Sequence, residues 1–156
     1  MRTALWVVNV IGGIAVLGSY AWGVTSVLEP GRLWGRIPEA IRPVYSAFMP
    51  LAAIGYLVIL AWAHRVPQWR MVAAMTVMLV CSTAWMPLSF AALENARLLP
   101  LVQLVLALTA LASLAMGLII WQSEPSALRT AALVGAMAFC WQTVILDALV
   151  WPRFFG

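Results

Sequence analysis

The sequence predicts an all-α integral membrane protein, a single domain built as a bundle of five transmembrane helices. Three observations lead to this prediction: 65% of the 156 residues are hydrophobic, only 9% are charged, and the charges leave five long apolar stretches between them. A water-soluble domain of this size cannot bury so much apolar surface. The solvent of this chain is therefore predicted to be a lipid bilayer, and the protein to be a multi-pass membrane protein.

The five predicted spans are stretches without Asp, Glu, Arg or His, except that the last one contains Asp147 near its end. They run from about residue 3 to 28, 43 to 63, 71 to 93, 98 to 123 and 130 to 152. Each is long enough to cross the hydrocarbon as a helix. Barrel strands are shorter and alternate between apolar and polar residues, which these stretches do not. The whole chain, residues 1–156, is thus predicted to form one membrane domain.

The first span follows Arg2 and has some features of a signal peptide. Its apolar run is longer than the apolar region of such a peptide, so we predict a retained helix. Ala15, Ser19 and Gly23 recur every four residues in this span, and Asn9 lies in a neighbouring stripe. Small residues at this spacing allow membrane helices to approach closely. The first span is therefore predicted to pack tightly against a neighbour.

Polar residues within the later spans predict a partly polar bundle interior, because lipid offers them no partner. These side chains are Ser82 and Ser89 in the third span, Gln103 in the fourth, and Gln142, Thr143 and Asp147 in the fifth. They can face a ligand. Alternatively, each hydroxyl bonds a carbonyl of its own helix and each amide bonds a neighbouring helix.

Two tryptophans, Trp85 and Trp141, lie well inside predicted spans. Most of the nine tryptophans fall near span ends, where the indole ring prefers the level of the lipid headgroups. An indole inside the hydrocarbon wants a partner for its N–H, and its flat ring can form the wall of a cavity. Core packing or contact with lipid is the alternative for both residues.

Asp147 is the most informative residue, because a carboxylate within a span is costly and by default faces protein or water. It lies one turn before Trp151, near the membrane surface that also holds the first and third loops. The arginines on that surface are candidate partners for a salt bridge: Arg32, Arg36, Arg42 and Arg97. A role at the mouth of a cavity and a helix-to-loop salt bridge both fit this position.

The basic residues are all arginines, and they lie between the apolar stretches rather than in one block. This distribution is typical of juxtamembrane anchors and not of a nucleic-acid-binding surface. Four arginines lie on the side of the N-terminus and five on the other side. The positive-inside rule therefore leaves the orientation open, and the sequence does not identify the membrane.

Little in the sequence supports catalysis or metal binding. His64 is beside Arg65 at a span end, which is typical of a solvated interfacial histidine. Cys81 and Cys140 lie in separate spans and are expected to behave as small apolar residues. Phosphate-binding, HExxH and GxSxG motifs are missing from the sequence. We therefore expect no metal site, no catalytic site and no required cofactor.

Three segments carry motifs in a recognisable order. Residues 42–58 (RPVYSAFMPLAAIGYLV) are similar to P-V-W-T-x-L-Y followed by G-Y-A-x-x-L-V-W, residues 84–90 (AWMPLSF) to W-S/P-x-x-F-F, and residues 146–151 (LDALVW) to L-N-x-x-x-W. These are motifs of the TspO or translocator proteins, also called tryptophan-rich sensory proteins, which have five membrane helices and about this length. The resemblance covers most of the chain.

The sequence departs from the family pattern at two places. Asp147 stands where the closing motif has asparagine, which adds a charge near the expected pocket. The first loop, residues 27–38 (VLEPGRLWGRIP), keeps only a leucine, two prolines and a tryptophan of the family's W-Y-x-x-L-x-K-P-x-W-x-P-P. The chain therefore resembles a remote or divergent member of the family.

The resemblance implies a pocket inside the bundle that opens toward the first loop and holds a porphyrin, another tetrapyrrole or a sterol-like lipid. The predicted ligand-binding residues are Asn9, Tyr45, Ser82, Trp85, Trp141 and Asp147. The predicted loop contacts are Arg32, Trp34 and Arg36. The aromatic rings would stack on the ligand, the polar groups would orient one edge, and an arginine would bind a carboxylate.

Partners are expected to be membrane lipid and the hydrophobic small molecule, with no nucleic acid. Family members often form homodimers, and the small-residue stripes permit one. Degradation of tetrapyrroles, reported for some relatives, is neither supported nor opposed by these residues. The alternative function is a structural or assembly subunit of a larger membrane complex with no ligand of its own. An occupied internal cavity would favour the first function, and stable co-purification with other subunits would favour the second.

Overall fold

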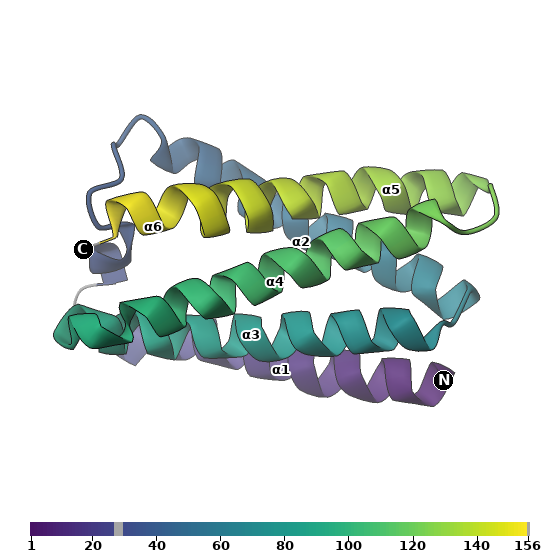
Figure 1. Cartoon of the computed structure of the whole chain (residues 1–156), viewed down its shortest axis with the longest axis horizontal. Coiled ribbons are helices and arrows are strands. Elements are labelled where there is room, and N and C mark those ends of the chain that lie inside the picture. Colours follow the sequence, from purple (N-terminus) through teal and green to yellow (C-terminus); the bar gives the residue numbers. More distant parts are fainter. Residues whose placement is uncertain (27–29, 156) are drawn as a thin grey trace.

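The computed structural model describes residues 1–26 and 30–155, and the regular structure in this part of the chain is helical. The elements are α1 (Arg2–Ser26), η1 (Pro30–Trp34), α2 (Arg42–Arg65), α3 (Trp69–Glu94), η2 (Ala96–Leu98), α4 (Leu99–Trp121), α5 (Ala127–Cys140), η3 (Trp141–Val150) and α6 (Trp151–Phe154). The elements α5, η3 and α6 follow one another without a break and form one long rod. The predicted all-α fold is confirmed (Figure 1).

Five helical segments are long and apolar enough to cross a membrane, which confirms the predicted multi-pass bundle. Their ends differ from the predicted ones by a few residues, because polar and proline residues join the helix termini. Pro43 occupies the first turn of α2, a position where its missing N–H costs nothing. The Ser126 hydroxyl caps α5 by accepting a hydrogen bond from the Arg129 N–H. The predicted end of the first span, at residues 27 and 28, lies outside the described residues.

The helices pack in the spatial order α1, α3, α4, α5, α2. A hydrogen bond from the Tyr56 hydroxyl on α2 to Asn9 on α1 joins the two ends of this series. The N-terminus and the C-terminus lie at opposite ends of the bundle, as five crossings require (Figure 1). We call these the N-terminal end and the C-terminal end.

Two apolar clusters fill the interior, one toward each end. The cluster toward the N-terminal end includes Trp62, Met71, Met75, Met116 and Ile120, all fully or almost fully buried. The cluster toward the C-terminal end includes Ile37, Tyr45, Val102, Leu146 and Trp151. Side chains with more than 60% of their surface exposed, such as those of Ile14 and Leu17, lie on the outside and face the lipid.

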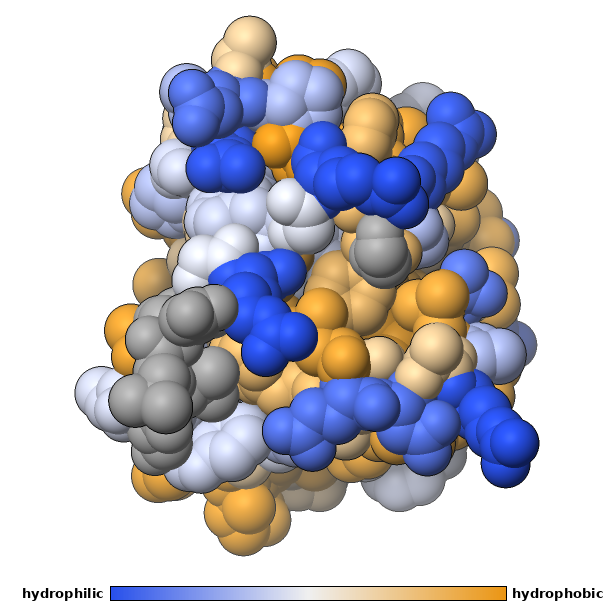
Figure 2. Space-filling view, turned by 90° about the vertical axis from the view of Figure 1, so that its left-hand side faces the viewer, coloured by the Kyte–Doolittle hydropathy of each residue, from blue (hydrophilic) through white to orange (hydrophobic). Residues whose placement is uncertain are grey.

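Residues 30–37 lie over the C-terminal end and are tied to the last described residues of the chain. The Arg36 N–H donates to the Phe154 carbonyl at 2.8 Å, and the Trp151 indole N–H donates to the Leu33 carbonyl at 2.9 Å. Gly35 makes this docking possible, because it has a φ of +51° and a Cβ there would overlap the Phe154 carbonyl oxygen. Figure 2 shows this end of the molecule, where hydrophilic side chains surround an apolar centre.

Small residues allow the close helix contacts that the sequence predicts, although not all at the predicted positions. Gly23 of α1 is buried against Met86 of α3, and Gly12 lies against Leu79. The closest backbone approach, however, joins α2 to α5, where a Cβ on Gly55 would overlap the carbonyl oxygen of Gly135. The bundle therefore depends on this glycine pair to bring α2 and α5 together.

We expect Gly55→Ala to lower the free energy of unfolding by about 1–3 kcal/mol, because the new methyl group meets backbone that cannot rotate away. Gly18→Ala is the matched control, since nothing lies within 4 Å of a Cβ there. Because alanine has a greater helix propensity than glycine, the Gly18→Ala protein should be as stable as the wild type or up to about 1 kcal/mol more stable. Thermal unfolding of both variants in one detergent, followed by circular dichroism, tests this. Equal melting temperatures would contradict the proposed contact.

Candidate functional site

The fifth span changes its helix type near the C-terminal end of the bundle. The chain is α-helical up to Cys140 and continues as a π-helix from Trp141 to Val150. An α-helix has about 3.6 residues per turn, so residues five apart lie on different faces. The wider turn of a π-helix, with i→i+5 hydrogen bonds, brings such residues together. Segments of this type are rare and are frequent at functional sites.

The π-helix places Gln142 beside Asp147. The Gln142 Nε2 group donates a hydrogen bond to Asp147 Oδ1 at 2.7 Å. The Asp147 side chain is partly buried, whereas Gln142 is only 6% exposed. Because the two residues are five apart, this contact follows directly from the altered helix.

The arginines predicted as partners of Asp147 lie elsewhere, and no ion pair between Asp147 and an arginine occurs among residues 1–26 and 30–155. Arg42 donates from Nε to the Ile37 carbonyl at 3.3 Å, and its guanidinium lies 5.9 Å from the centre of the Trp34 ring. The remaining candidates are exposed at the C-terminal end: Arg32, Arg36 and Arg97. Asp147 therefore bonds to the Gln142 amide and not to an arginine of the described residues.

Aromatic side chains from the other helices lie in the same part of the bundle as Asp147. The Tyr45 hydroxyl of α2 donates to the Leu146 carbonyl at 2.7 Å. Tyr20 of α1 lies edge-on to Trp85 of α3, with ring centres 5.8 Å apart. Trp85 in turn lies edge-on to Trp151, which follows Asp147 by one turn, with ring centres 5.8 Å apart. We call Tyr20, Tyr45, Trp85, Gln142 and Asp147 the acidic–aromatic cluster.

Three buried polar atoms in this half of the bundle have no hydrogen-bond partner among the described residues. They are Trp85 Nε1, Ser89 Oγ and Gln142 Oε1. Ser89 lies one helical turn beyond Trp85 on α3 and is completely buried. Almost all buried polar atoms in proteins are paired, so each exception requires an explanation. A bound molecule that supplies the missing partners is one such explanation.

Two predicted ligand-binding residues, Asn9 and Ser82, bond within the protein. Asn9 is buried nearer the N-terminal end, where it donates to the Leu5 carbonyl at 2.8 Å and accepts from Tyr56. Its amide therefore joins α1 to α2 and is already satisfied. The Ser82 hydroxyl contacts the sulfur of Met78 at 3.5 Å, on its own helix. The structure does not bring either residue into the acidic–aromatic cluster.

The other predicted residues divide into two groups. Tyr45, Trp85 and Asp147 come together in the cluster, whereas Trp141 is 47% exposed and packs against Phe48, with ring centres 5.8 Å apart. The next two residues, Gln142 and Thr143, are both buried, and the Gln142 amide has its partner inside the bundle, where lipid would offer it none. Of the loop residues, Trp34 packs edge-on against Tyr45, with ring centres 5.8 Å apart, while Arg32 and Arg36 are exposed.

Sequence reasoning missed Tyr20 and Gln142 as members of the site. Both residues belong to polar or small-residue stripes within the spans, but nothing in the sequence links them to Asp147. The signal that could have linked Gln142 is its spacing of five from Asp147. That spacing carries meaning only in a π-helix, which propensity and periodicity do not predict. Gln103, also predicted to be internal, is exposed on α4.

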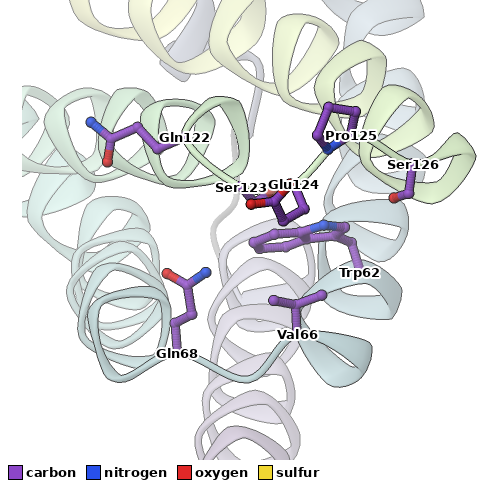
Figure 3. Close-up of a pocket in the computed structure, with 8 residues that line it drawn as sticks. All are labelled: Trp62, Val66, Gln68, Gln122, Ser123, Glu124, Pro125 and Ser126. Atoms are coloured by element: carbon purple, nitrogen blue, oxygen red, sulfur yellow. The ribbon is translucent and has the colours of Figure 1, made fainter.

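Two surface pockets lie at the N-terminal end, away from the acidic–aromatic cluster. One, of about 420 Å³, is lined by Trp62, Val66 and residues of the α2–α3 and α4–α5 connections (Figure 3). In Figure 3 the Trp62 indole lies beneath the segment from Ser123 to Pro125, with Gln68 and Gln122 to one side. The other pocket, of about 320 Å³, lies between α1 and α2. Neither is lined by a predicted ligand-binding residue.

The described residues include no group of three or more His, Cys, Asp or Glu side chains that could hold a metal ion. His64 packs edge-on against Trp6, with ring centres 5.2 Å apart, close to the N-terminal end. The chemistry available at the acidic–aromatic cluster is therefore that of one carboxylate, one amide, phenols and an indole. Such groups can bind and orient a molecule.

Comparisons with protein-family models, with curated proteins and with solved structures found no match to this chain. The resemblance to the TspO proteins stays a prediction from the three sequence motifs. A function for this chain therefore has to be inferred from the residues of the acidic–aromatic cluster and their contacts.

We expect Asp147→Asn to raise the free energy of unfolding by about 1–2 kcal/mol, because it removes a charge from the membrane interior and keeps an oxygen that accepts from Gln142. Glu94→Gln is the matched control, since Glu94 is exposed at the end of α3 and its change should stay within about 0.5 kcal/mol. Chemical or thermal unfolding in detergent measures both. A less stable Asp147→Asn protein would show that the carboxylate is a structural group.

Proposed function

We propose that this protein binds or carries a hydrophobic small molecule in the half of the bundle that holds the acidic–aromatic cluster. One observation supports this most: Asp147 has no arginine partner among the described residues, and unpartnered buried polar atoms lie in the same half of an otherwise apolar bundle. An ionisable residue inside a membrane span is costly and is retained where it has a function. Binding a ligand would supply the missing partners.

The position of the cluster is compatible with entry from the bilayer. Tyr20 is 38% exposed on the outer surface of α1, and its ring contacts Trp85 of the cluster. The contacts that join α1 to α2, from Asn9 to Tyr56 and from Trp6 to His64, lie closer to the N-terminal end. A molecule dissolved in lipid could therefore reach the cluster between α1 and α2.

The resemblance to the TspO proteins suggests a tetrapyrrole or a sterol-like lipid as the ligand. A rigid, flat molecule suits the rings of Tyr20, Tyr45 and Trp85, because stacked and edge-on contacts between aromatic rings add to simple burial. The molecule would be a cargo or a signal rather than a cofactor, because nothing in the cluster requires it for chemistry. The same arrangement is compatible with a homodimer.

The second candidate is a structural or assembly subunit of a larger membrane complex. The exposure of Trp141 supports it, because an indole on the outer surface within a span gains a partner when another protein covers it. The apolar clusters that fill both ends of the bundle are also what a purely structural protein needs. This candidate predicts that the purified chain binds no small molecule.

A titration with protoporphyrin dimethyl ester, a tetrapyrrole without free carboxylates, followed by quenching of tryptophan fluorescence, tests the proposed function. We expect saturable quenching, and we expect Trp85→Phe to weaken binding about three- to tenfold because it removes the indole N–H and part of the ring surface. Trp69→Phe is the control, since Trp69 is 66% exposed at the opposite end of α3. Absence of saturable binding, together with fixed co-purification of other membrane proteins, would favour the structural role instead.

A further inference from the structure

We infer that the molecule bound at the acidic–aromatic cluster is a hydrophobic organic cation that carries an ammonium N–H group. This inference rests on the proposed function and narrows it. Three features of the cluster lead to it: its charge, the kind of hydrogen-bonding group left without a partner, and the aromatic rings around it.

The only group of the cluster that can carry a full charge near neutral pH is an acid. Asp147 is the only carboxyl side chain within the five spans predicted from the sequence, and its hydrogen-bond partner Gln142 is neutral. The side chains of Arg32, Arg36, Arg97 and Arg153 at the same end are exposed, and Arg42 is engaged with Ile37 and Trp34. Because charges interact strongly where water is scarce, a cation next to Asp147 would be stabilised and an anion repelled.

The oxygen atoms of the Gln142–Asp147 pair are acceptors that call for a hydrogen-bond donor from outside the pair. Gln142 uses its amide nitrogen to bind Asp147, which leaves the amide oxygen Oε1 buried with no partner among the described residues. A carboxylate and an amide oxygen are both acceptors, so two acceptors lie side by side on one face of the π-helix. An ammonium group brings both the charge and several N–H donors to this pair. A carboxylate ligand brings neither.

Aromatic rings complete the environment that an organic cation prefers. Tyr20 and Trp85 lie with ring centres 5.8 Å apart, and Trp85 lies at the same distance from Trp151. The faces of such rings attract cations, most strongly where water is excluded. The apolar body of the ligand would contact these rings while its ammonium group approaches Asp147. The lone donor Trp85 Nε1 would bind a π face or an acceptor on that body.

This arrangement opposes the expectation that Arg32 or Arg36 binds a ligand carboxylate. Both arginine side chains are exposed, whereas Asp147 is partly buried in the acidic–aromatic cluster. A molecule that enters from the lipid would meet the acidic group and not the guanidinium groups. The sign of the ligand's charge therefore distinguishes an internal site from a site on the end surface.

Three probes that share one apolar body test the inference: naphthylmethylamine, naphthylmethanol and naphthoate, which at neutral pH are a cation, a neutral molecule and an anion. Binding to the purified protein in detergent is followed by quenching of tryptophan fluorescence. We expect the amine to bind about tenfold or more tightly than the alcohol, and naphthoate to bind most weakly. In Asp147→Asn the preference for the amine should disappear while the alcohol still binds.

The ratio of amine affinity to alcohol affinity is compared between the wild type and Asp147→Asn. Because each probe enters the detergent to the same extent in both samples, this partition does not affect the comparison. Binding of the alcohol also shows that the variant is folded. Tyr20→Leu is a second variant, which should reduce amine binding more than alcohol binding because it removes a ring face. Equal affinities for all three probes, or an amine preference that survives in Asp147→Asn, would overturn the inference and leave the proposed function intact. If none of these probes binds and protoporphyrin dimethyl ester does not bind either, the proposed function itself fails.

Discussion

Within lipid, a polar group finds a partner inside the protein or finds none, and this requirement governs how the bundle is held together. Hydroxyl groups along the helices meet it by bonding carbonyls of the preceding turn, as Thr109 and Thr143 do. Between helices, the Ser113 and Thr143 hydroxyls meet at 2.8 Å and join α4 to η3. Asn9 does the same for α1 and α2 through Tyr56. In these places polar groups act as links between helices.

The half of the bundle toward the C-terminal end departs from this rule. There a carboxylate is held by a single neutral amide, and an indole N–H, a serine hydroxyl and an amide oxygen have no partner among the described residues. Substituting asparagine for Asp147 would satisfy Gln142 equally well, so packing alone gives no reason for an acidic residue. One half of the bundle therefore links its helices through paired polar groups, whereas the other half leaves several polar atoms unpaired among the described residues.

The π-helix connects this polar region to the architecture of the bundle. By widening the turn after Cys140, it turns Gln142 inward beside Asp147 and leaves Trp141 on the outside against Phe48. The Tyr45 hydroxyl bonds the carbonyl of Leu146 within this segment, so α2 supports the altered backbone directly. Residues 30–37 cover the same end: the Trp151 indole N–H donates to the Leu33 carbonyl, and the Arg36 N–H donates to the Phe154 carbonyl. The local change in helix type is therefore embedded in contacts from several elements.

The five helices, their approximate ends and the membrane environment could be predicted from the amino-acid sequence, because long apolar runs without charges have no other stable arrangement in lipid. Asp147, Tyr45 and Trp85 could also be identified from the sequence as candidate site residues. Polar and aromatic residues inside a span are unusual whether their side chains point toward lipid or toward protein. Which of these residues meet became clear only from the packed bundle. The packing separates Asn9 from the cluster, turns Trp141 outward, and brings Gln142 to Asp147 and Tyr20 to Trp85. Helix order and the π-turn depend on contacts among distant segments, which periodicity within one helix does not encode.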